Sequence, residues 1–325
     1  MSTWFDRPLT LAGRVIVRGE DVMQPETLLL HIKRPLLQIS NLAIHFNRQV
    51  NDGVALSKQK DVLPLLGQIT SQLEAGNLLM NVILEELNST IADCQFCAKD
   101  VLDFDLYLAD ATPACTFGVH NEFISSGRLD DLSMCYAGLE ALIASDTTDT
   151  TQVLALFDNE EVGSQTKQGA DSHVLPDILR RIYHAFGLTD DDFSADLARA
   201  FMLSVDVAHA IHPNVPEKCD VTNQPVMGCG VALKIASNQR YAGDAAAVAV
   251  VKSLCRENDI PYQVFMNRSD IPGGSTLGSL LSANLPLRAM DIGIPITAMH
   301  SCRELMGAAD QESLVRLIRA FFSHK

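Results

Sequence analysis

The most constraining feature of the chain is the apolar run at residues 151–157, Thr-Gln-Val-Leu-Ala-Leu-Phe, together with the acids that follow it, Asp158, Glu160 and Glu161. A short apolar run with β-branched residues, bounded by polar residues, predicts a buried strand. In open α/β sheets, ligands bind beyond the carboxyl ends of the strands. There, one glutamate can bind a hard cation while its neighbour transfers protons, as in metal-assisted hydrolases. The alternative interpretation is an acidic loop that faces solvent.

Composition limits the class of protein and its partners. The chain has 325 residues, 47% of them hydrophobic and 20% charged, which is typical of a globular protein with one large or two ordinary domains. The net charge of −15 argues against nucleic acid or an acidic membrane surface as a partner, because both attract basic patches. No apolar run approaches the ~20 residues that span a bilayer. We therefore expect neither nucleic acid nor a membrane among the partners.

Cysteine usage and the N-terminus indicate a cytoplasmic protein. The eight cysteines are scattered, mostly among apolar residues, which is typical of reduced core thiols. The first residues lack the charged and apolar segments of a signal peptide. Cys94 and Cys97 have the spacing of half a zinc knuckle or of a redox pair, but a pair of core cysteines one helical turn apart is the favoured interpretation.

The hydrophobic pattern predicts two domains. Residues 1–116 are expected to form a β-rich domain, with strands at 9–18, 27–32 and 102–108, short extended pieces at 36–40 and 42–46, and a helix at 77–88.

Residues 117–325 are expected to form an α/β domain, because longer strands and helices alternate there. The predicted strands are at residues 151–157, 201–205, 262–266 and 287–292, and the predicted helices are at 132–144, 174–186, 245–254 and 310–322. Asp244 is expected to cap the helix that begins at residue 245.

Candidate metal ligands lie at the ends of these predicted elements. Asp130 precedes a helix, Asp206 follows a strand, and His300 follows the last strand. Taken singly, Asp130 can be a helix cap, Asp206 a turn residue and His300 a core histidine. Together with Glu160 and Glu161, they form the ligand set of a divalent metal. Two zinc ions bridged by one carboxylate need about this many groups.

Six distinctive segments are distributed along the whole chain. They are residues 2–7 (STWFDR), 9–15 (LTLAGRV), 157–164 (FDNEEVGS), 204–214 (SVDVAHAIHPN), 269–278 (SDIPGGSTLG) and 298–304 (AMHSCRE). In these segments, and in their order, the chain resembles the aspartyl aminopeptidase family of dizinc exopeptidases. The resemblance implies an α/β fold in which a zinc-exopeptidase-like sheet is sandwiched by helices, with a smaller β-rich oligomerisation domain. Residues 1–116 then form the oligomerisation domain and residues 117–325 the catalytic metallopeptidase domain.

The resemblance implies a role for each candidate residue. Asp130 corresponds to the carboxylate that bridges two zinc ions, and Glu160 to the general base that accepts a proton from the attacking water. Glu161 and His300 correspond to ligands of one zinc ion, and Asp206 to a ligand of the other.

The resemblance also implies a substrate pocket and a homo-oligomer. Lys234 and Tyr241 correspond to substrate-binding positions, where the lysine can meet an acidic side chain as a point charge. His45 corresponds to a histidine that family members insert into the active site of a neighbouring subunit. The family assembles as dimer-based homo-oligomers up to a dodecamer.

One departure from the family pattern affects the metal centre. Family members carry an N-terminal segment with a His-x-Asp motif that supplies a zinc histidine, and this chain contains no His-x-Asp. We therefore expect the catalytic sheet to be N-terminally incomplete and to leave apolar surface exposed. One zinc site would lack its histidine and keep only Asp130 and Asp206. His209 or His212 could substitute as a ligand, but both already have counterparts in family members that possess the upstream histidine.

Two functions from different classes remain open. The first is a zinc-dependent aminopeptidase, a hydrolase that removes acidic N-terminal residues, Asp or Glu, from peptides. The second is a truncated or inactive family member that acts as a non-catalytic assembly subunit. Metal content and release of Asp from a short peptide distinguish the two.

Overall fold

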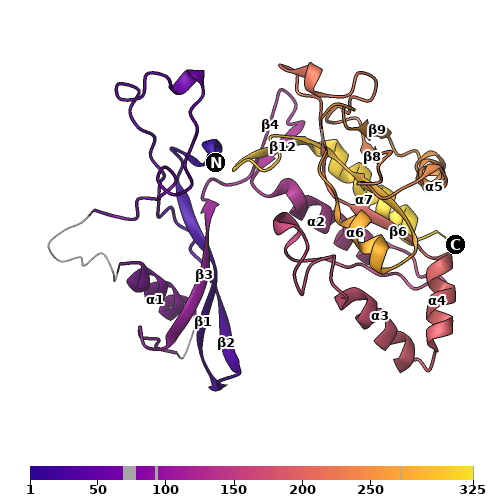
Figure 1. Ribbon diagram of the computed structural model, residues 1–325, viewed down its shortest axis with the longest axis horizontal. Coiled ribbons are helices and arrows are strands. Elements are labelled where there is room, and N and C mark those ends of the chain that lie inside the picture. The colour runs from indigo at the N-terminus through magenta and orange to yellow at the C-terminus, as the bar shows by residue number, and fades with distance from the viewer. Residues whose placement is uncertain (69–77, 92–93, 272, 325) are drawn as a thin grey trace. The chain divides into compact units, whose positions relative to one another are not determined.

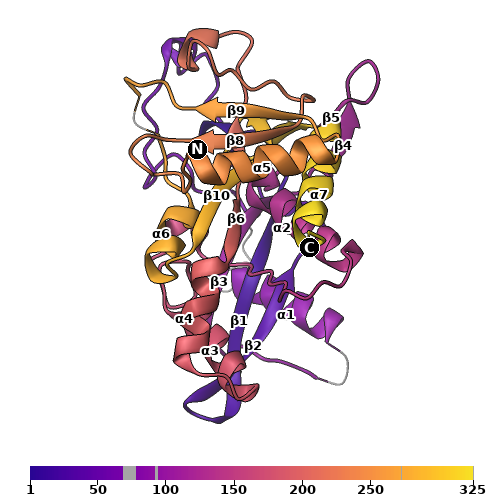
Figure 2. The same ribbon diagram turned by 90° about the vertical axis from the view of Figure 1, so that its right-hand side faces the viewer.

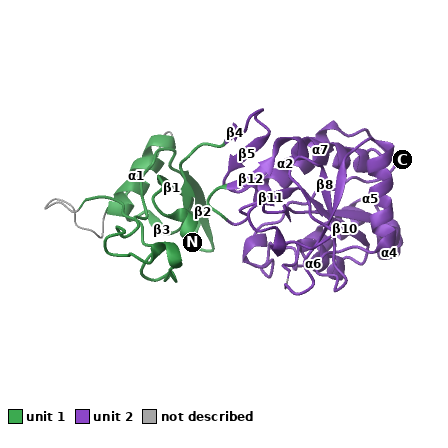
Figure 3. Ribbon diagram, turned by 90° about the horizontal axis from the view of Figure 1, so that it is seen from above, with its two compact units in different colours: residues 1–114, 301–303 green, residues 115–300, 304–325 purple. Residues whose placement is uncertain are grey.

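The computed structural model describes residues 1–68, 78–91, 94–271 and 273–324. The chain divides into two compact units (Figure 3): unit 1 contains residues 1–114 and 301–303, and unit 2 contains residues 115–300 and 304–325. None of the described helices is long and apolar enough to cross a membrane. Short 3-10 helices occur at Ser2–Trp4, Val50–Asp52, Glu160–Val162 and Pro216–Lys218.

Unit 1 is built on a three-stranded antiparallel sheet in the order β2-β1-β3 (Figure 1). Its elements are β1 (Leu9–Asp21), β2 (Gln24–His31), α1 (Leu78–Thr90) and β3 (Val101–Asp110). The helix buries Ile83 and Leu87 in one apolar cluster with alternate side chains of the sheet, among them Leu9, Val15 and Leu30. Burial of alternate residues on one face is what the period of a strand requires. The three predicted strands and the helix of this region are therefore confirmed, although residue 77 lies outside the described residues.

The short extended pieces predicted after β2 have a mixed outcome. Residues 36–40 contribute isolated bridges, such as that between Leu9 and Leu37. No strand forms at residues 42–46, and that prediction is wrong. Leu42, Ile44 and Phe46 are exposed there, so no sheet face of the described chain buries their alternating pattern.

Unit 2 contains two sheets among the described residues. The four-stranded sheet has the order β6-β10-β8-β9, and the five-stranded sheet has the order β4-β5-β12-β11-β7. The strands are β4 (Cys115–Phe117), β5 (Phe123–Ser126), β6 (Phe201–Val205), β7 (Ala208–His209), β8 (Val231–Ile235), β9 (Tyr262–Met266), β10 (Arg288–Gly293), β11 (Pro295–Thr297) and β12 (Glu304–Gly307). The strands predicted at 201–205, 262–266 and 287–292 are confirmed. The sequence did not predict the short strands of the second sheet.

Helices cover the four-stranded sheet (Figure 2). They are α2 (Leu129–Ala144), α3 (Val174–Ala185), α4 (Asp190–Arg199), α5 (Ala245–Glu257), α6 (Leu277–Asn284) and α7 (Ala308–Phe322). One apolar cluster joins α2, α5 and α7 to buried side chains of β8 and β10, such as Leu233 and Ile292. A second cluster joins α4 and α6 to α3 and to Met202 of β6. The α/β fold class is confirmed, as is the Asp244 cap, which accepts a hydrogen bond from Ala247 N at 2.8 Å.

The strand predicted at residues 151–157 is wrong. The segment carries no strand assignment, and the backbone of residues 153–157 makes no hydrogen bond with the backbone of another described residue. A strand needs a neighbour as well as apolar side chains, and the described chain places none beside it. Apolar side chains are exposed in this unit at Leu132, Tyr136, Leu139 and Ile143 of α2 and at Val153 and Leu156.

The cysteine prediction is correct only in part. Cys255 is buried, as a core thiol should be, and burial raises its pKa to about 11. Cys94 and Cys97 are both exposed and form no disulfide, so their interpretation as a core pair is wrong. They lie three positions apart on an irregular segment, and neither side chain belongs to the apolar cluster of unit 1.

Candidate metal centre

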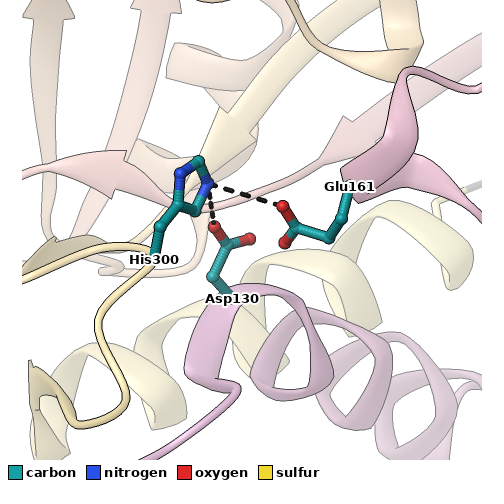
Figure 4. A group of neighbouring side chains, drawn as sticks. All are labelled: Asp130, Glu161 and His300. Carbon is teal, nitrogen blue, oxygen red and sulfur yellow. Dashed lines mark ion pairs between the residues drawn. The ribbon is translucent and has the colours of Figure 1, made fainter. Parts of the chain in front are cut away.

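Asp130, Glu161 and His300 lie together in unit 2 (Figure 4). His300 Nε2 is 3.1 Å from Asp130 Oδ2 and 3.5 Å from Glu161 Oε2. The Asp130 side chain is only 5% exposed, whereas those of His300 and Glu161 are 66% and 55% exposed. The three side chains therefore converge from a buried base toward an open rim.

Local backbone conformation aims each of these side chains. Asp130 and its neighbour Asp131 stand at the start of α2 in non-helical conformations, and regular helix begins at Leu132. No described backbone N–H donates to the Asp130 carboxylate, which faces His300 instead of capping the helix (Figure 4). His300 has a φ of 63°, in the left-handed region that non-glycine residues seldom occupy.

Glu160 and Glu161 sit on the 3-10 turn Glu160–Val162, and their side chains diverge as a result. The turn lies between Asn159 and Gly163, whose φ values of 60° and 100° are both left-handed. Glu161 extends toward His300, while Glu160 lies in the field of Asp206 and Lys234. Adjacent glutamates thus serve different parts of the same centre.

A second group of acids shares Asp130. Ligand atoms of Asp130, Asp131 and Asp206 all lie within 4.8 Å of one another. Oδ1 of Asp131 is buried and has no hydrogen-bond partner among the described residues. Asp206 lies between β6 and β7, where its N–H donates to Ile292 O at 3.0 Å. Gly293 permits this close approach, because an added Cβ would lie 1.7 Å from the Asp206 carbonyl oxygen.

The buried ammonium of Lys234 compensates part of this negative charge. Its side chain is 2% exposed, and its Nζ donates to Asp206 Oδ2 at 2.9 Å. The ammonium also lies 5.2 Å from the ring centroid of Tyr241, whose hydroxyl accepts a hydrogen bond from Asn267 Nδ2 at 2.9 Å. Asp291, fully buried nearby, accepts hydrogen bonds from Ser204 Oγ and the backbone N–H of Ala242.

The crowded acids shift one another's pKa values. Burial and then the charges of Asp206 and Glu161 raise the pKa of Asp130 to about 7. Burial, Asp206 and Asp130 raise the pKa of Asp131 well above its ordinary value. Burial followed by Asp206 raises the pKa of Glu160, and burial raises that of Glu161. Carboxylates that repel one another in this way are stabilised by a cation placed among them.

Glu304 is a member of the centre that the sequence did not reveal. Its carboxylate is 2% exposed and accepts hydrogen bonds from His300 N at 2.7 Å and Asp130 N at 3.0 Å. The sequence also did not single out the roles of Asp131 or Asp291. When an acid stands beside another acid or at the end of an apolar strand, the local sequence does not show whether it is buried or exposed to solvent.

The other predicted histidines do not join the two ligand groups formed by the described residues. The ring of His209 lies 6.1 Å from that of Phe265, and His212 Nδ1 accepts a hydrogen bond from Asn214 N. They are therefore not arranged as replacement ligands. His45 is an exposed residue of unit 1.

The donor set fits zinc. One imidazole nitrogen and two carboxylates are a usual three-residue ligand set for this ion, and they leave a fourth position for water or substrate. The Asp130, Asp131 and Asp206 group is all oxygen, which also suits harder divalent cations. Burial and then the charges of Asp206 and Glu161 raise the pKa of Asp130, and a bound cation would offset that repulsion.

Comparison with known proteins agrees with this chemistry. A family model described as aminopeptidase I zinc metalloprotease (M18) matches residues 1–322. A probable M18 family aminopeptidase 2 from Clostridium acetobutylicum is 48% identical over 323 residues, covering 99% of this chain and 73% of the relative. Aspartyl aminopeptidase 1 from Schizosaccharomyces pombe is 37% identical over 344 residues, covering 99% of this chain and 71% of that protein.

Solved structures show the same fold. A cryo-EM structure of the Ape4 and Nbr1 complex matches with a TM-score of 0.91 and 36% identity, covering 99% of this chain and 64% of that chain. The mApe1 dodecamer from S. cerevisiae matches with a TM-score of 0.79 and 26% identity, covering 100% of this chain and 70% of that chain. This chain thus spans between 64% and 73% of the length of these four proteins.

Proposed function

Because the chain belongs to the M18 family of zinc aminopeptidases, we propose that it removes N-terminal residues from peptides at the centre built on Asp130, Glu161 and His300. The observation that carries the proposal is the approach of His300 Nε2 to both carboxylates, at 3.1 and 3.5 Å, beside the half-buried Glu160. A zinc ion held there supplies a Lewis acid for the scissile carbonyl and lowers the pKa of a water molecule toward neutrality.

Two ions per chain are the proposed complement, with Asp130 shared between them. Asp130, Glu161 and His300 would hold the first, and Asp130 and Asp206 would hold the second. Asp131, one of whose ligand atoms lies within 4.8 Å of those of Asp130 and Asp206, is the proposed third oxygen ligand of the second ion. Carboxylate oxygens alone form a harder ligand set, so we expect the second site to be less selective for zinc.

Glu160 is the proposed general base. Burial and the charges of Asp206 and Glu161 raise its pKa above its ordinary value, which favours a group that both accepts and returns a proton. In this role Glu160 accepts a proton from the attacking water and returns it to the leaving amine. Glu161, whose carboxylate already faces His300, is committed to the ligand group and is not available for proton transfer.

Preference for an acidic first residue is the proposed specificity. The relative from Schizosaccharomyces pombe is named aspartyl aminopeptidase 1, which supports this preference. Lys234 is the proposed partner of the substrate carboxylate, and Tyr241 lines the same place. Since the Lys234 ammonium is paired with Asp206, substrate recognition requires that ion pair to loosen. A lysine locked by Asp206 would instead act only as a counter-charge.

Self-association into a homo-oligomer is also proposed. A solved relative is a dodecamer, and Leu42, Ile44 and Phe46 expose apolar side chains around His45 in unit 1. We propose that this segment contacts a neighbouring copy and brings His45 to its active site. Unit 1 is then the oligomerisation domain and unit 2 the catalytic domain. A cytoplasmic location is proposed from the cysteine pattern alone.

The test is a comparison of Glu160→Gln with Asp158→Asn, a matched loss of one charge two residues away on an exposed side chain. We expect Glu160→Gln to reduce kcat for Asp release from a short peptide by about 10²- to 10⁴-fold while leaving the zinc content unchanged. Asp158→Asn should change neither quantity. A Glu160→Gln protein with wild-type kcat contradicts the proposed role.

The alternative, a non-catalytic assembly subunit, has less support. Two of the four proteins compared above are named aminopeptidases, and none of the four is described as a non-catalytic subunit. The ligand group around His300 also keeps all three of its side chains. A zinc-loaded oligomer without any turnover of Asp, Glu or Leu peptides would favour the alternative.

A further inference from the structure

Glu304 joins the two segments that carry the ligand group. It is the first residue of β12, and its side chain is buried. Oε1 accepts a hydrogen bond from His300 N at 2.7 Å, and Oε2 accepts one from Asp130 N at 3.0 Å. One planar carboxylate therefore holds the backbones of two residues that are 170 positions apart in the chain, directly behind the side chains that meet at 3.1 Å.

Within the part of the chain that the structure describes, these two N–H groups bond to no backbone carbonyl. Asp130 is in a non-helical conformation and His300 is left-handed, so neither residue is held by a regular helix or strand. A hydrogen bond to a carboxylate is shorter and about twice as strong as one between neutral groups. Glu304 is itself held by the sheet, because β12 pairs with β5, where Glu304 lies opposite Ser126. The sheet is therefore the rigid element, and Glu304 fixes the backbones of Asp130 and His300 relative to it.

We propose that Glu304 is a positioning residue that sets the separation of Asp130 Oδ2 and His300 Nε2 for a divalent cation, a role that rests on the metal centre proposed above. Glu304 does not touch the cation or the substrate. Its part is to remove the freedom that the two irregular segments would otherwise have, so that ligand side chains need not be ordered when the cation binds.

The chain offers a matched control for this role. Asp310, at the start of α7, is likewise fully buried and accepts two backbone hydrogen bonds, from Gly228 N at 2.6 Å and Gly230 N at 2.7 Å. Neither glycine belongs to a ligand group. Removing the Asp310 carboxylate therefore disrupts two backbone hydrogen bonds, as removing the Glu304 carboxylate does, but away from the metal centre.

The experiment compares Glu304→Gln with Asp310→Asn. The side-chain amide in the Glu304→Gln variant keeps the shape of the carboxylate but replaces one acceptor oxygen by an NH₂ group, which cannot accept from the second N–H. Metal-free protein is titrated with Zn²⁺ by calorimetry and with Co²⁺ by visible absorption. We expect Glu304→Gln to weaken Zn²⁺ affinity by about 10- to 100-fold and to change the Co²⁺ spectrum. Asp310→Asn should lower Tm by a similar amount and leave affinity and spectrum unchanged.

The outcomes separate this role from the proposed function. Wild-type affinity and spectrum in Glu304→Gln, or equal losses of affinity in both variants, overturn the role of Glu304 and leave the metal centre standing. A wild-type protein that binds no Zn²⁺ overturns the metal centre and this role with it. If Glu304→Gln does not fold, Glu304→Asp makes the same comparison, because the shorter carboxylate keeps its charge and cannot reach both N–H groups.

Discussion

The two ligand groups share Asp130 but differ in how their charge is balanced. On one side, Glu161 and His300 bring a carboxylate and an imidazole to an open rim, with side chains 55% and 66% exposed. On the other side, Asp131 and Asp206 bring only carboxylates, in a more enclosed place. A buried ammonium, that of Lys234, already bonds to Asp206 in this second group. The negative charge of the second group is therefore partly neutralised before any cation arrives.

The difference predicts an order of binding. A cation that enters the His300 group meets preassembled ligands. A cation that enters the Asp206 group must compete with Lys234, whose charge lies 2.9 Å away. Burial by itself lowers the pKa of Lys234, but Asp206 and Asp291 raise it above its ordinary value, so the ammonium stays charged. We therefore expect two sites of unequal affinity, the His300 site being the tighter.

The largest predicted effect follows removal of the shared residue. Asp130→Asn takes a charged ligand from both groups at once, so we expect zinc affinity to fall by more than about 100-fold, beyond the usual effect of losing a residue that only supports a ligand. Calorimetric titration of metal-free protein measures this. Asp158→Asn, which removes an exposed acid outside both groups, is the control. Loss of only one of the two ions in Asp130→Asn would show that the groups do not share this residue.

Lys234→Met tests the balance of charge in the second group. The substitution leaves Asp206 and Asp291 without their buried partner, which should lower the free energy of unfolding of the metal-free protein by about 3–5 kcal/mol. Added zinc should recover part of that loss, because a cation replaces the missing charge. Denaturant unfolding with and without zinc measures both quantities. A loss that zinc does not reduce would contradict the competition between Lys234 and the cation.

Lowering the pH should weaken zinc binding. Asp130, with a pKa of about 7, is mostly protonated at pH 6 and mostly ionised at pH 8, so affinity should fall about tenfold between pH 8 and pH 6. The stability of the metal-free protein should follow the opposite sign. Between the ordinary value of 3.8 and about 7, the native carboxyl binds more protons than the unfolded one, so the free energy of unfolding falls as the pH rises through this window. Calorimetry and denaturant unfolding across pH 5–8 measure the two trends. Affinity that is constant with pH would count against Asp130 as a ligand.

Asp131→Asn should change the stability of the metal-free protein less than Lys234→Met does, and in the opposite direction. It removes a buried, repelled carboxylate whose Oδ1 has no partner among the described residues, so at pH 8 we expect the metal-free protein to gain about 1–2 kcal/mol of unfolding free energy. Binding at the His300 group should not change, while the weaker second event should be lost. Thermal unfolding and a zinc titration check the two expectations. A loss of the tight event would place Asp131 in the first group instead.

The sequence predicted the parts of the molecule that depend on local pattern. Helical and strand periodicity located β1, β6, β9, α5 and α7, because each buries one face against a core that its own pattern specifies. Acids and a histidine beside predicted elements pointed to Asp130, Glu161 and His300, although the strand predicted before Glu161 does not form. Their roles stay proposals, and their proximity is what the structure adds.

The rest depends on partners that lie far away in the sequence. Residues 151–157 have the composition of a buried strand, yet pairing is a property of two segments, and no described segment pairs with them. Glu304 has the composition of a solvated acid, and only the fold brings Asp130 N and His300 N to its two oxygens. Lys234 was expected to bind the acidic side chain of a substrate, but in the structure it forms an ion pair with Asp206.

The most direct test of this account is a zinc titration of metal-free protein that compares His300→Ala with Asp206→Asn. We predict two binding events in the wild-type protein. His300→Ala should lose the tighter event and keep the weaker one, while Asp206→Asn should keep the tighter event and lose the weaker one. A single event in the wild-type protein that survives His300→Ala unchanged would contradict the assignment of His300, and with it the two-group centre.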